Sequence, residues 1–345
     1  MHSGVRIGGW SWVWRPWIVL ATAVLAALTF LIFCISISVG DFTIELSAVF
    51  QTIFAEGARV DEFVIMDLRM PRALVGLIVG TALGISGALT QSIARNPLAS
   101  PDVLGITSGA SATAVFLVTA TGGAAITSSI GLPAAALLGG LLTGLLVYFL
   151  AWRRGIDGFR LILIGIAVNA AMQALTTWLL ALADIRDVAR AQAWLVGSLD
   201  ARSWTEVWTS LWITVALVVI VLVTAFQLRP MHFGDDVAAG LGVRYTAVRA
   251  VLLLCAVLLA GVAVSAAGPV PFVALVAPQI TMRLLRTPVP PLLASGLFGA
   301  LLLIGSDLVA RVVLPNDLPV GIVTAIIGGP FLVYLLVRAN VKRAA

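Results

Sequence analysis

The 345-residue sequence has few side chains that could hold a metal ion or carry out covalent chemistry. It contains two cysteines and two histidines, and charged residues make up 11% of it. Cys34 and Cys255 both lie in apolar runs, where a cysteine is usually a small core side chain. His2 and His232 are far apart in the sequence. We therefore expect no metal site.

Two motifs of catalysis are also missing. The sequence has no GxxxxGK[ST] motif, so it does not supply a phosphate-binding loop of its own. It has no cluster that would pair a nucleophile with a base. These absences indicate that the chain is not an enzyme by itself.

Apolar residues are abundant, at 61% of the sequence, and the mean hydropathy is +1.09. Soluble domains are about half apolar, so this composition indicates a membrane protein with several spans. Runs close to the ~20 residues that cross a bilayer recur along the chain, and the eighth is too short to cross alone. We predict an all-α fold of about ten transmembrane helices, near residues 17–39, 73–92, 103–120, 132–151, 161–182, 207–228, 250–267, 271–284, 291–309 and 319–337.

The formal charge is +5, and Lys342 is the only lysine. With the N-terminus in the cytoplasm, most arginines fall in cytoplasmic loops and most acidic residues in the opposite loops, as the positive-inside rule requires. This distribution favours membrane orientation over nucleic-acid binding. An even number of spans places both termini in the cytoplasm. We expect a single transmembrane domain over 1–345, with 1–16 and 230–249 as cytoplasmic segments.

Residues 69–110 combine arginines, a glycine-rich span and a polar break, which a simple membrane anchor would not need. Gly76, Gly80, Gly84 and Gly87 predict close helix packing, and Gly140 and Gly144 do so in a later span. Polar residues at membrane depth either face a water-filled cavity or bond to other helices. Both readings stay open for Gln91, Asn96, Ser108, Asn169 and Gln173.

Residues 231–245 predict a short helix on the cytoplasmic face. Asp235 and Asp236 stand where carboxylates suit a helix N-terminus, and Gly240 and Gly242 follow as breaks. Such a segment is either a docking site for a soluble partner or a solvated loop.

Five stretches stand out along the chain: RMPR (69–72), QSIARNPLASPDVLGITSGA (91–110), FGDDVAAGLGV (233–243), GPVPFVALVAPQITMRLL (268–285) and LPVGIVTAIIGGPFLVYLL (318–336). Together they resemble the permease family of bacterial ABC importers for iron-siderophores, haem and cobalamin. A further stretch, RGIDGFRLILIGIAVNA (154–170), resembles the ferric-enterobactin-type subunit of permease pairs. Gln279 departs from many relatives, which carry histidine there, so a proton role at this position is not expected.

The resemblance implies a multi-pass permease of the bacterial cytoplasmic membrane that translocates ferric siderophore. The implied partners are a second permease subunit, by resemblance a paralogue, two ATPase subunits, an extracytoplasmic siderophore-binding protein and membrane lipid. ATP and Mg²⁺ would be bound by the ATPase subunits, and this chain would bind no cofactor and no nucleic acid.

The resemblance also implies roles for particular residues. Docking of the binding protein falls on Arg69, Arg72 and Arg311, although Asp307 could instead pair with Arg311 at i, i+4. Contact with the ATPase falls on Gly234, Asp235, Asp236, Ala239 and Gly242. The translocation path is assigned to Gln91, Asn96, Pro97, Ser108, Asn169 and Gln173, with spans 73–92, 103–120 and 161–182 as its walls.

Two alternative functions remain. A cobalamin or haem importer would share this architecture. An ion-coupled secondary transporter would be expected to carry ionisable residues at mid-membrane, whereas Asp307 is the lone acid well within a predicted span.

Overall fold

The structure is a computed structural model that describes residues 4–7, 10–13, 15–40, 44–45, 47, 49, 51–52, 59–121, 131–152, 158–231, 237, 240–242, 244–314 and 318–344. The predicted ten-helix, all-α architecture is confirmed. The helices in the ten predicted runs are α1 (Pro16–Ser38), α4 (Met70–Ala94), α5 (Ile106–Ala120), α6 (Gly131–Ala151), α7 (Gly158–Leu182), α9 (Trp204–Ala225), α12 (Tyr245–Ala267), α13 (Val273–Leu284), α14 (Leu292–Val312) and α15 (Val320–Ala344).

Eight of the described helical segments are long and apolar enough to cross a membrane, and two are shorter. The shorter ones are α5 and α13. The short α13 agrees with the prediction for the eighth run. The shortening of α5 was not predicted, and it arises because the chain turns from residue 95 to 105 before the helix begins.

Several small elements join the long helices. A short antiparallel pair of strands, β1 (Gly4–Ile7) and β2 (Trp10–Val13), precedes α1. A surface helix, α8 (Ile185–Leu195), ends shortly before Gly197, which has a φ of +74°. The remaining small elements are α3 (Arg59–Glu62), the π-helix η1 (Phe63–Arg69) and α10 (Leu228–Met231).

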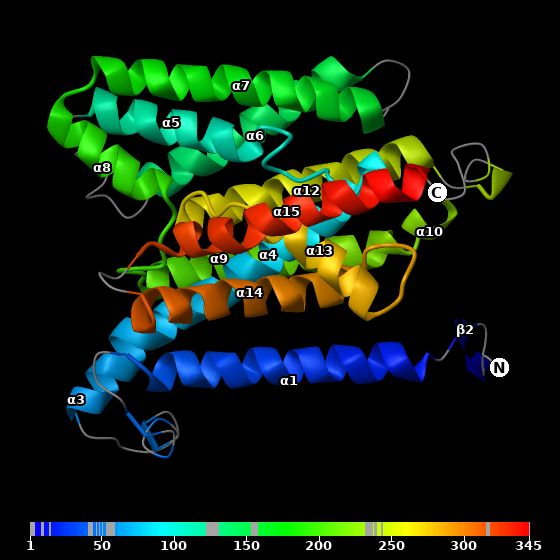
Figure 1. Ribbon diagram of the computed structural model, residues 1–345, viewed down its shortest axis with the longest axis horizontal. Coiled ribbons are helices and arrows are strands. Elements are labelled where there is room, and N and C mark those ends of the chain that lie inside the picture. Colours follow the sequence, from blue (N-terminus) through cyan, green and yellow to red (C-terminus); the bar gives the residue numbers. More distant parts are fainter. Residues whose placement is uncertain are drawn as a thin grey trace.

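Helix α4 is the centre of the bundle and crosses it at a tilt (Figure 1). It packs against α14, α12, α13 and α9. Helices α5, α6 and α7 form a layer on one side, and α1 lies at the opposite edge beside α14 (Figure 1). The burial follows this order: 83% of the most apolar window of Phe63–Ala94 is buried, against 17% for the windows of α1 and α7.

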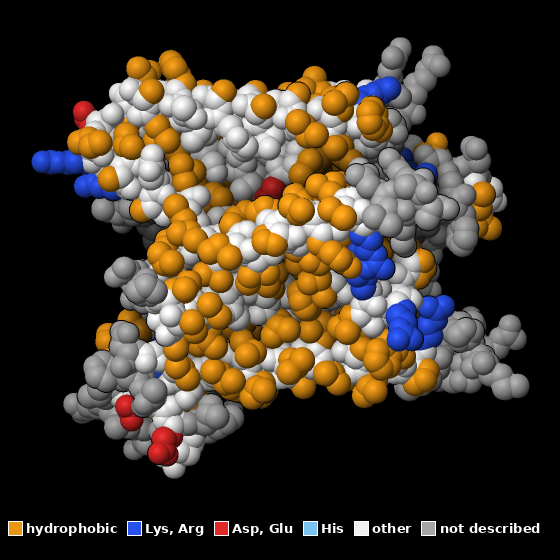
Figure 2. All heavy atoms as spheres, viewed as in Figure 1, with side chains coloured by type: hydrophobic (Ala, Val, Ile, Leu, Met, Phe, Trp, Pro, Cys, Tyr) orange, Lys and Arg blue, Asp and Glu red, His pale blue; other side chains and the backbone are white. Residues whose placement is uncertain are grey.

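The two ends of the bundle carry different elements. The N-terminal strands, α10 and the end of α15 lie together at one end, here called the α10 end, and α3 and α8 lie at the other, the α8 end (Figure 1). The described termini therefore share one end, as an even number of crossings requires. Most of the lysine and arginine visible in Figure 2 lies toward the α10 end, and apolar side chains cover the long flank between the ends.

The glycines of α4 let its neighbours approach to backbone contact, as predicted. A Cβ at Gly84 would overlap the carbonyl of Ser295 on α14, and one at Gly87 would overlap the carbonyl of Ala274 on α13. The Ala274 carbonyl would normally accept from the residue four positions later, which is Pro278 and has no N–H. The Ala274 carbonyl therefore lacks its helical donor, and glycine at position 87 leaves room for it. Helices α4 and α13 pack closely at this point.

This packing predicts that Gly84→Ala destabilises the protein by about 1–3 kcal/mol, because the added methyl group would force two backbones apart. The matched control is Gly305→Ala on α14, where a Cβ meets nothing within 4 Å. That substitution should be neutral or slightly stabilising, since alanine favours helix over glycine. Thermal unfolding of the detergent-solubilised protein measures both. Equal melting temperatures for the two variants would refute the packing role of Gly84.

Candidate functional site

Two chain interruptions build the site. One lies between α4 and α5, where Arg95 and Gly105 have φ values of 49° and 78°. The other lies between α12 and α13, where Gly268 and Phe272 have φ values of 73° and 68°. Both segments contain two prolines, which cannot continue a helix. Backbone without helical hydrogen bonds is tolerated at membrane depth where it is buried in protein or lines a cavity.

A cavity of about 870 Å³ lies beside these interruptions. Its walls come from α5, α7 and the start of α15, with the chain after α8 and the α12–α13 connection closing one side. In Figure 2 the surface is hollowed between the α5–α7 layer and α15, and an acidic side chain is visible inside the hollow. The lining residues are Asp102, Thr107, Ser108, Ser111, Asn169, Gln173, Thr176, Thr177, Leu180, Leu195, Val196, Pro269, Pro271, Gly321, Ile322, Ala325 and Ile326.

Three of the six residues assigned to the path meet in this cavity. Ser108 comes from α5, and Asn169 and Gln173 are one turn apart on α7. The Gln173 side-chain amide nitrogen donates to the side-chain oxygen (Oδ1) of Asn169 over 3.1 Å. The cavity therefore combines two of the three spans expected to line a path, α5 and α7.

Gln91 occupies a different environment, inside the helix packing. Its amide nitrogen donates to the Leu275 carbonyl over 3.1 Å, and its oxygen accepts from the Gln279 amide over 2.7 Å. Both glutamines are buried, at 3% exposed. This is the helix–helix bonding that the sequence left open as an alternative, and it gives Gln279 a structural partner.

Asn96 and Pro97 lie in the turn that follows α4. The Asn96 side-chain oxygen accepts from the Leu98 backbone N–H over 2.9 Å, which closes a local turn. Pro97 is exposed. The preceding Arg95 donates to the Met231 carbonyl of α10 over 2.6 Å, so the turn is tied to the α10 end of the molecule.

Sequence reasoning missed several lining residues. Asp102 lies in the turn before α5, and its carboxylate accepts from the Thr107 hydroxyl over 2.5 Å. Thr176 and Thr177 extend the polar stripe of α7, and Gly321–Ile326 of α15 forms the facing wall. Asp102 could have been found from the sequence, because it directly follows Pro101 in a proline-containing break before a predicted helix. The α15 wall gave no polar signal, because its lining residues are small or apolar.

The three arginines assigned to docking gather at the α8 end, and two of them pair with one buried carboxylate. Asp307, whose side chain is 2% exposed, accepts from Arg72 over 2.9 Å and pairs with Arg311 over 3.2 Å. The i, i+4 pair of Asp307 and Arg311 was the alternative noted from sequence, and it is present. Arg72 also reaches Asp200, an exposed residue of the α8–α9 connection, over 3.2 Å.

Arg69 and Arg311 also bind the last carbonyls of α1. Arg69 is buried and donates to the carbonyls of Ile37 and Ser38 over 2.9 and 3.0 Å. Arg311 donates to the Ser36 carbonyl over 2.8 Å. The last carbonyls of a helix lack partners within it, so these arginines act as a cap supplied by other helices.

The predicted ATPase contact lies mostly outside the described residues: Gly234, Asp235, Asp236 and Ala239 all do. Gly242 is described. It has a φ of 78°, and a Cβ there would meet nothing within 4 Å. It lies three residues before α12, whose first turn is at the α10 end (Figure 1).

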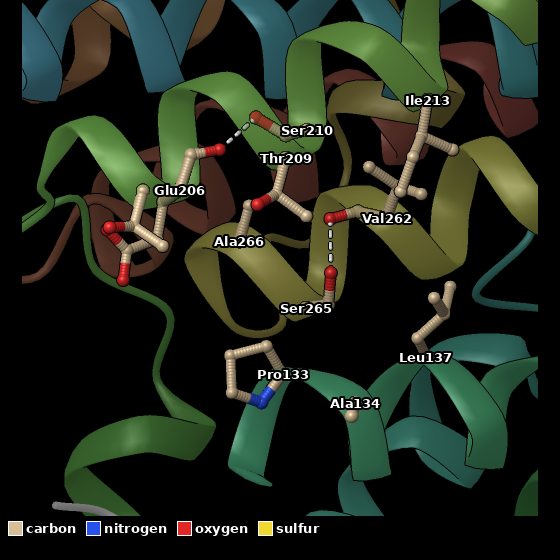
Figure 3. Close-up of a pocket in the computed structure, with 11 residues that line it drawn as sticks. Pro133, Ala134, Leu137, Glu206, Thr209, Ser210, Ile213, Val262, Ser265 and Ala266 are labelled. Atoms are coloured by element: carbon tan, nitrogen blue, oxygen red, sulfur yellow. Dashed lines mark hydrogen bonds between the residues drawn. The ribbon is translucent and has the colours of Figure 1, made fainter. Parts of the chain in front are cut away.

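A smaller hollow of about 180 Å³ lies between α6, α9 and α12 (Figure 3). Three of its polar side chains, those of Ser210, Ser265 and Glu206, bond to groups of their own helix or its N-cap. Ser210 donates to the Glu206 carbonyl over 2.6 Å, Ser265 donates to the Val262 carbonyl over 2.8 Å, and the Glu206 carboxylate caps α9 through Ser203.

No cluster of three histidine, cysteine or acidic side chains able to hold a metal is found within the described part of the chain. An all-helical membrane bundle with a polar cavity beside two broken helices is the architecture of a membrane transport protein. The FecCD transport family model matches residues 10–338. The chain belongs to this family, as the resemblance of its motifs indicated.

Two relatives and one solved structure are similar over most of the chain. The ferric enterobactin transport system permease protein FepG of Escherichia coli is 40% identical, over 88% of this chain and 91% of the relative. The iron(3+)-hydroxamate import system permease protein FhuG of Bacillus subtilis is 38% identical, over 94% of this chain and 98% of the relative. A metal-chelate type ABC transporter in an inward-facing conformation superposes with a TM-score of 0.79 at 26% identity, covering 92% of this chain and 99% of that chain.

The arginine cluster predicts that Asp307→Asn destabilises the protein by about 3–5 kcal/mol, because two arginines would lose their buried counter-charge. The matched control is Asp200→Asn, which removes the other carboxylate bound by Arg72. Asp200 is 77% exposed, so its loss should change stability by at most about 1 kcal/mol. Chemical or thermal unfolding of the purified protein compares them. Similar losses in both variants would show that Asp307 is not the centre of the cluster.

Proposed function

We propose that this chain is the permease subunit of an ABC importer that moves ferric siderophore across the bacterial cytoplasmic membrane. The observation that carries the proposal is the polar cavity of about 870 Å³ beside two broken helices, in a chain of the FecCD transport family. ATP hydrolysis belongs to a separate ATPase subunit, which would hold ATP and Mg²⁺. FepG and FhuG, the relatives described above, carry names that refer to iron chelates.

The lining suits a large hydrophilic cargo that must pass without being trapped. Hydroxyl and amide groups from Ser108, Asn169 and Gln173 offer weak, replaceable hydrogen bonds. A tight, fully enclosing site would hold the chelate instead of releasing it. The wide and weakly polar wall is therefore what a translocation path needs.

We further propose that a second permease subunit covers the open side of the cavity. Gln173 and Thr177 are exposed on α7, at membrane depth, and Trp178 beside them and Ile326 on α15 are also exposed. Polar groups facing acyl chains are costly, whereas a partner subunit would enclose them in a shared path. The family resemblance favours a paralogue as this partner.

At the α8 end, Arg72 is the best placed of the three arginines to meet an extracytoplasmic binding protein. Its side chain is 21% exposed, against 11% for Arg311, and Arg69 is buried. We propose that Arg72 contacts the binding protein and that Arg69 and Arg311 fix the frame around it. Exposed charges of this kind steer a partner more than they hold it.

At the α10 end, the proposal places the ATPase contact on the segment that includes Gly234, Asp235, Asp236, Ala239 and Gly242. The clustering of basic side chains toward this end in Figure 2 supports a cytoplasmic orientation under the positive-inside rule. Both termini would then be cytoplasmic.

The cargo can be tested by uptake in a strain whose only copy of this permease is deleted and then restored. Deletion should abolish accumulation of radioactive iron supplied as ferric siderophore and leave cobalamin and haem uptake unchanged. Restoration with the chain should recover iron uptake, but not when the ATPase subunit carries a substituted phosphate-binding lysine. Loss of cobalamin or haem uptake, with iron uptake intact, would favour the alternative importer.

Coupling can be tested at Gly242. A valine there would be strained at a φ of 78°, so Gly242→Val should distort the ATPase contact without touching the bundle core. We expect stimulation of ATP hydrolysis by loaded binding protein to fall on the order of tenfold in the assembled complex. The control is Gly240→Val, where φ is not positive and a Cβ also meets nothing within 4 Å. Unchanged stimulation in Gly242→Val would remove this residue from the coupling segment.

A further inference from the structure

Three exposed arginines lie near one another at the α10 end of the molecule. Arg283 is in the last turn of α13, Arg286 follows it in the connection to α14, and Arg338 is in the last third of α15. These three residues are here called the arginine patch. Figure 2 shows basic side chains grouped toward this end, directly beside the apolar flank of the bundle.

Aromatic rings join Arg283 to Arg338. The guanidinium carbon of Arg283 lies 5.6 Å from the centre of the Phe331 ring and 5.9 Å from the centre of the Tyr334 ring. Arg338 donates to the Tyr334 hydroxyl over 2.8 Å. The two arginines are also near enough for their charges to repel each other. An anion bound between them would relieve this repulsion.

Trp17 attaches the start of α1 to the same patch. Its indole N–H donates to the Leu284 carbonyl at the end of α13 over 3.1 Å. The guanidinium carbon of Arg286 lies 5.8 Å from the centre of the Trp17 ring. Tryptophan and tyrosine are enriched at the depth of the lipid headgroups. Trp17 and Tyr334 therefore place the arginine patch where a lipid phosphate can reach it.

No acidic side chain offsets the charge of the patch. Residues 1–40, 237–306 and 318–345 contain neither aspartate nor glutamate, and they include α1, α13, α15 and the α13–α14 connection. Within the described part of the chain, no carboxylate forms an ion pair with an arginine of the patch. An arginine has several N–H donors, and Arg283 and Arg338 each use one of them in a hydrogen bond between described residues. The remaining donors can bind an external anion.

The patch faces away from the cavity and from the subunit proposed to cover it. Ile322 and Ala325 of α15 line the cavity. At about 100° of turn per residue, Tyr334 and Arg338 lie on the opposite side of this helix, roughly half a turn away. A second subunit over the cavity would therefore leave the arginine patch open to lipid.

An apolar surface continues from the patch along α1 and α14, which pack against each other. Leu20 and Val24 of α1 and Leu293 of α14 are all exposed. In a membrane such side chains contact acyl chains. Basic pockets between membrane helices bind anionic headgroups, and here the basic groups and the apolar surface adjoin each other.

We propose that the arginine patch binds the phosphate headgroup of an anionic phospholipid whose acyl chains lie along α1 and α14. Arginine suits this ligand because its N–H donors match the oxygens of a phosphate. A zwitterionic phospholipid carries a positive group beside the same phosphate, so it should bind less well. The inference goes beyond the proposed function and does not depend on the cargo.

The test measures lipid preference in the complete importer by native mass spectrometry. The detergent-solubilised complex is mixed with equal amounts of phosphatidylglycerol, which is anionic, and phosphatidylcholine, which is zwitterionic. The unmodified complex should retain phosphatidylglycerol in preference. Arg286→Gln combined with Arg338→Gln should lower this preference on the order of tenfold, because each arginine near an anionic surface changes it by roughly fivefold. Arg283 is left in place because it also donates to the Gln279 carbonyl of α13.

The matched control is Arg186→Gln combined with Arg190→Gln. These two arginines are exposed on α8, at the opposite end of the bundle. The control removes the same amount of charge, and it should keep the preference of the unmodified complex. Should the patch variant fail to fold, Arg286→Gln and Arg338→Gln are measured singly, and each should lower the preference by roughly fivefold.

Three outcomes would overturn the lipid site. The first is an unchanged preference in the double variant or in both single variants. The second is displacement of the lipid by an equal concentration of inorganic phosphate, which has no acyl chains and would identify a site for soluble anions. The third is loss of the ATPase subunits from the variant complex with unchanged lipid preference, which would assign the patch to a protein contact. None of these measurements uses transport, so a failure of the proposed cargo would appear separately, in iron uptake.

Discussion

The structure depends on two helix breaks within the apolar bundle, where backbone N–H and C=O groups must still find hydrogen-bond partners. The segments after α4 and after α12 both end in prolines and positive-φ residues, and hydrocarbon offers no hydrogen bonds to such backbone. The breaks are stabilised by each other: Asp102 of the first receives a bond from the Phe272 backbone of the second. The Gln279 side-chain amide also donates to the Gln91 side-chain oxygen over 2.7 Å, which joins α13 to α4. The cavity lies beside this junction, and Asp102, Pro269 and Pro271 of the two breaks line it.

The sequence predicted the ten helices because each apolar run is bounded by charged residues, glycine or proline, and these signals are local. It also predicted the close packing of α4, where glycine recurs every three or four residues on a central helix. It could not assign Gln91, because a buried amide can equally bond a neighbouring helix or face a cavity. That choice was decided by where α13 lies, and in particular by the Leu275 carbonyl. Nor could it place α15 in the wall, since Gly321 and Ala325 carry no polar pattern.

The arginines at the α8 end show the same limit of sequence reasoning. Arg69 ends η1, Arg72 lies in the first turn of α4, and Arg311 lies in the last turn of α14. All three converge on the junction of α1, α4 and α14. The convergence needs Asp307, which neutralises two of them while almost fully buried. A cap for α1 and a surface for a partner can coexist here because Arg72 alone keeps a substantial exposed face. The capping role falls on Arg69 and Arg311, and the docking role proposed for the cluster falls on Arg72.

Helix α12 runs from the Gly242 segment at the α10 end to the second chain interruption. It begins three residues after Gly242 and ends at Gly268, where the second chain interruption starts. Its 23 residues span roughly 35 Å at 1.5 Å per residue. Most of its side chains are buried against α4, α6 and α9, so it is a closely packed helix along its length. A displacement at the Gly242 segment would therefore be delivered at Pro269 and Pro271, which line the cavity. The break after α12 is thus the point where a motion imposed from outside the membrane could change the shape of the path.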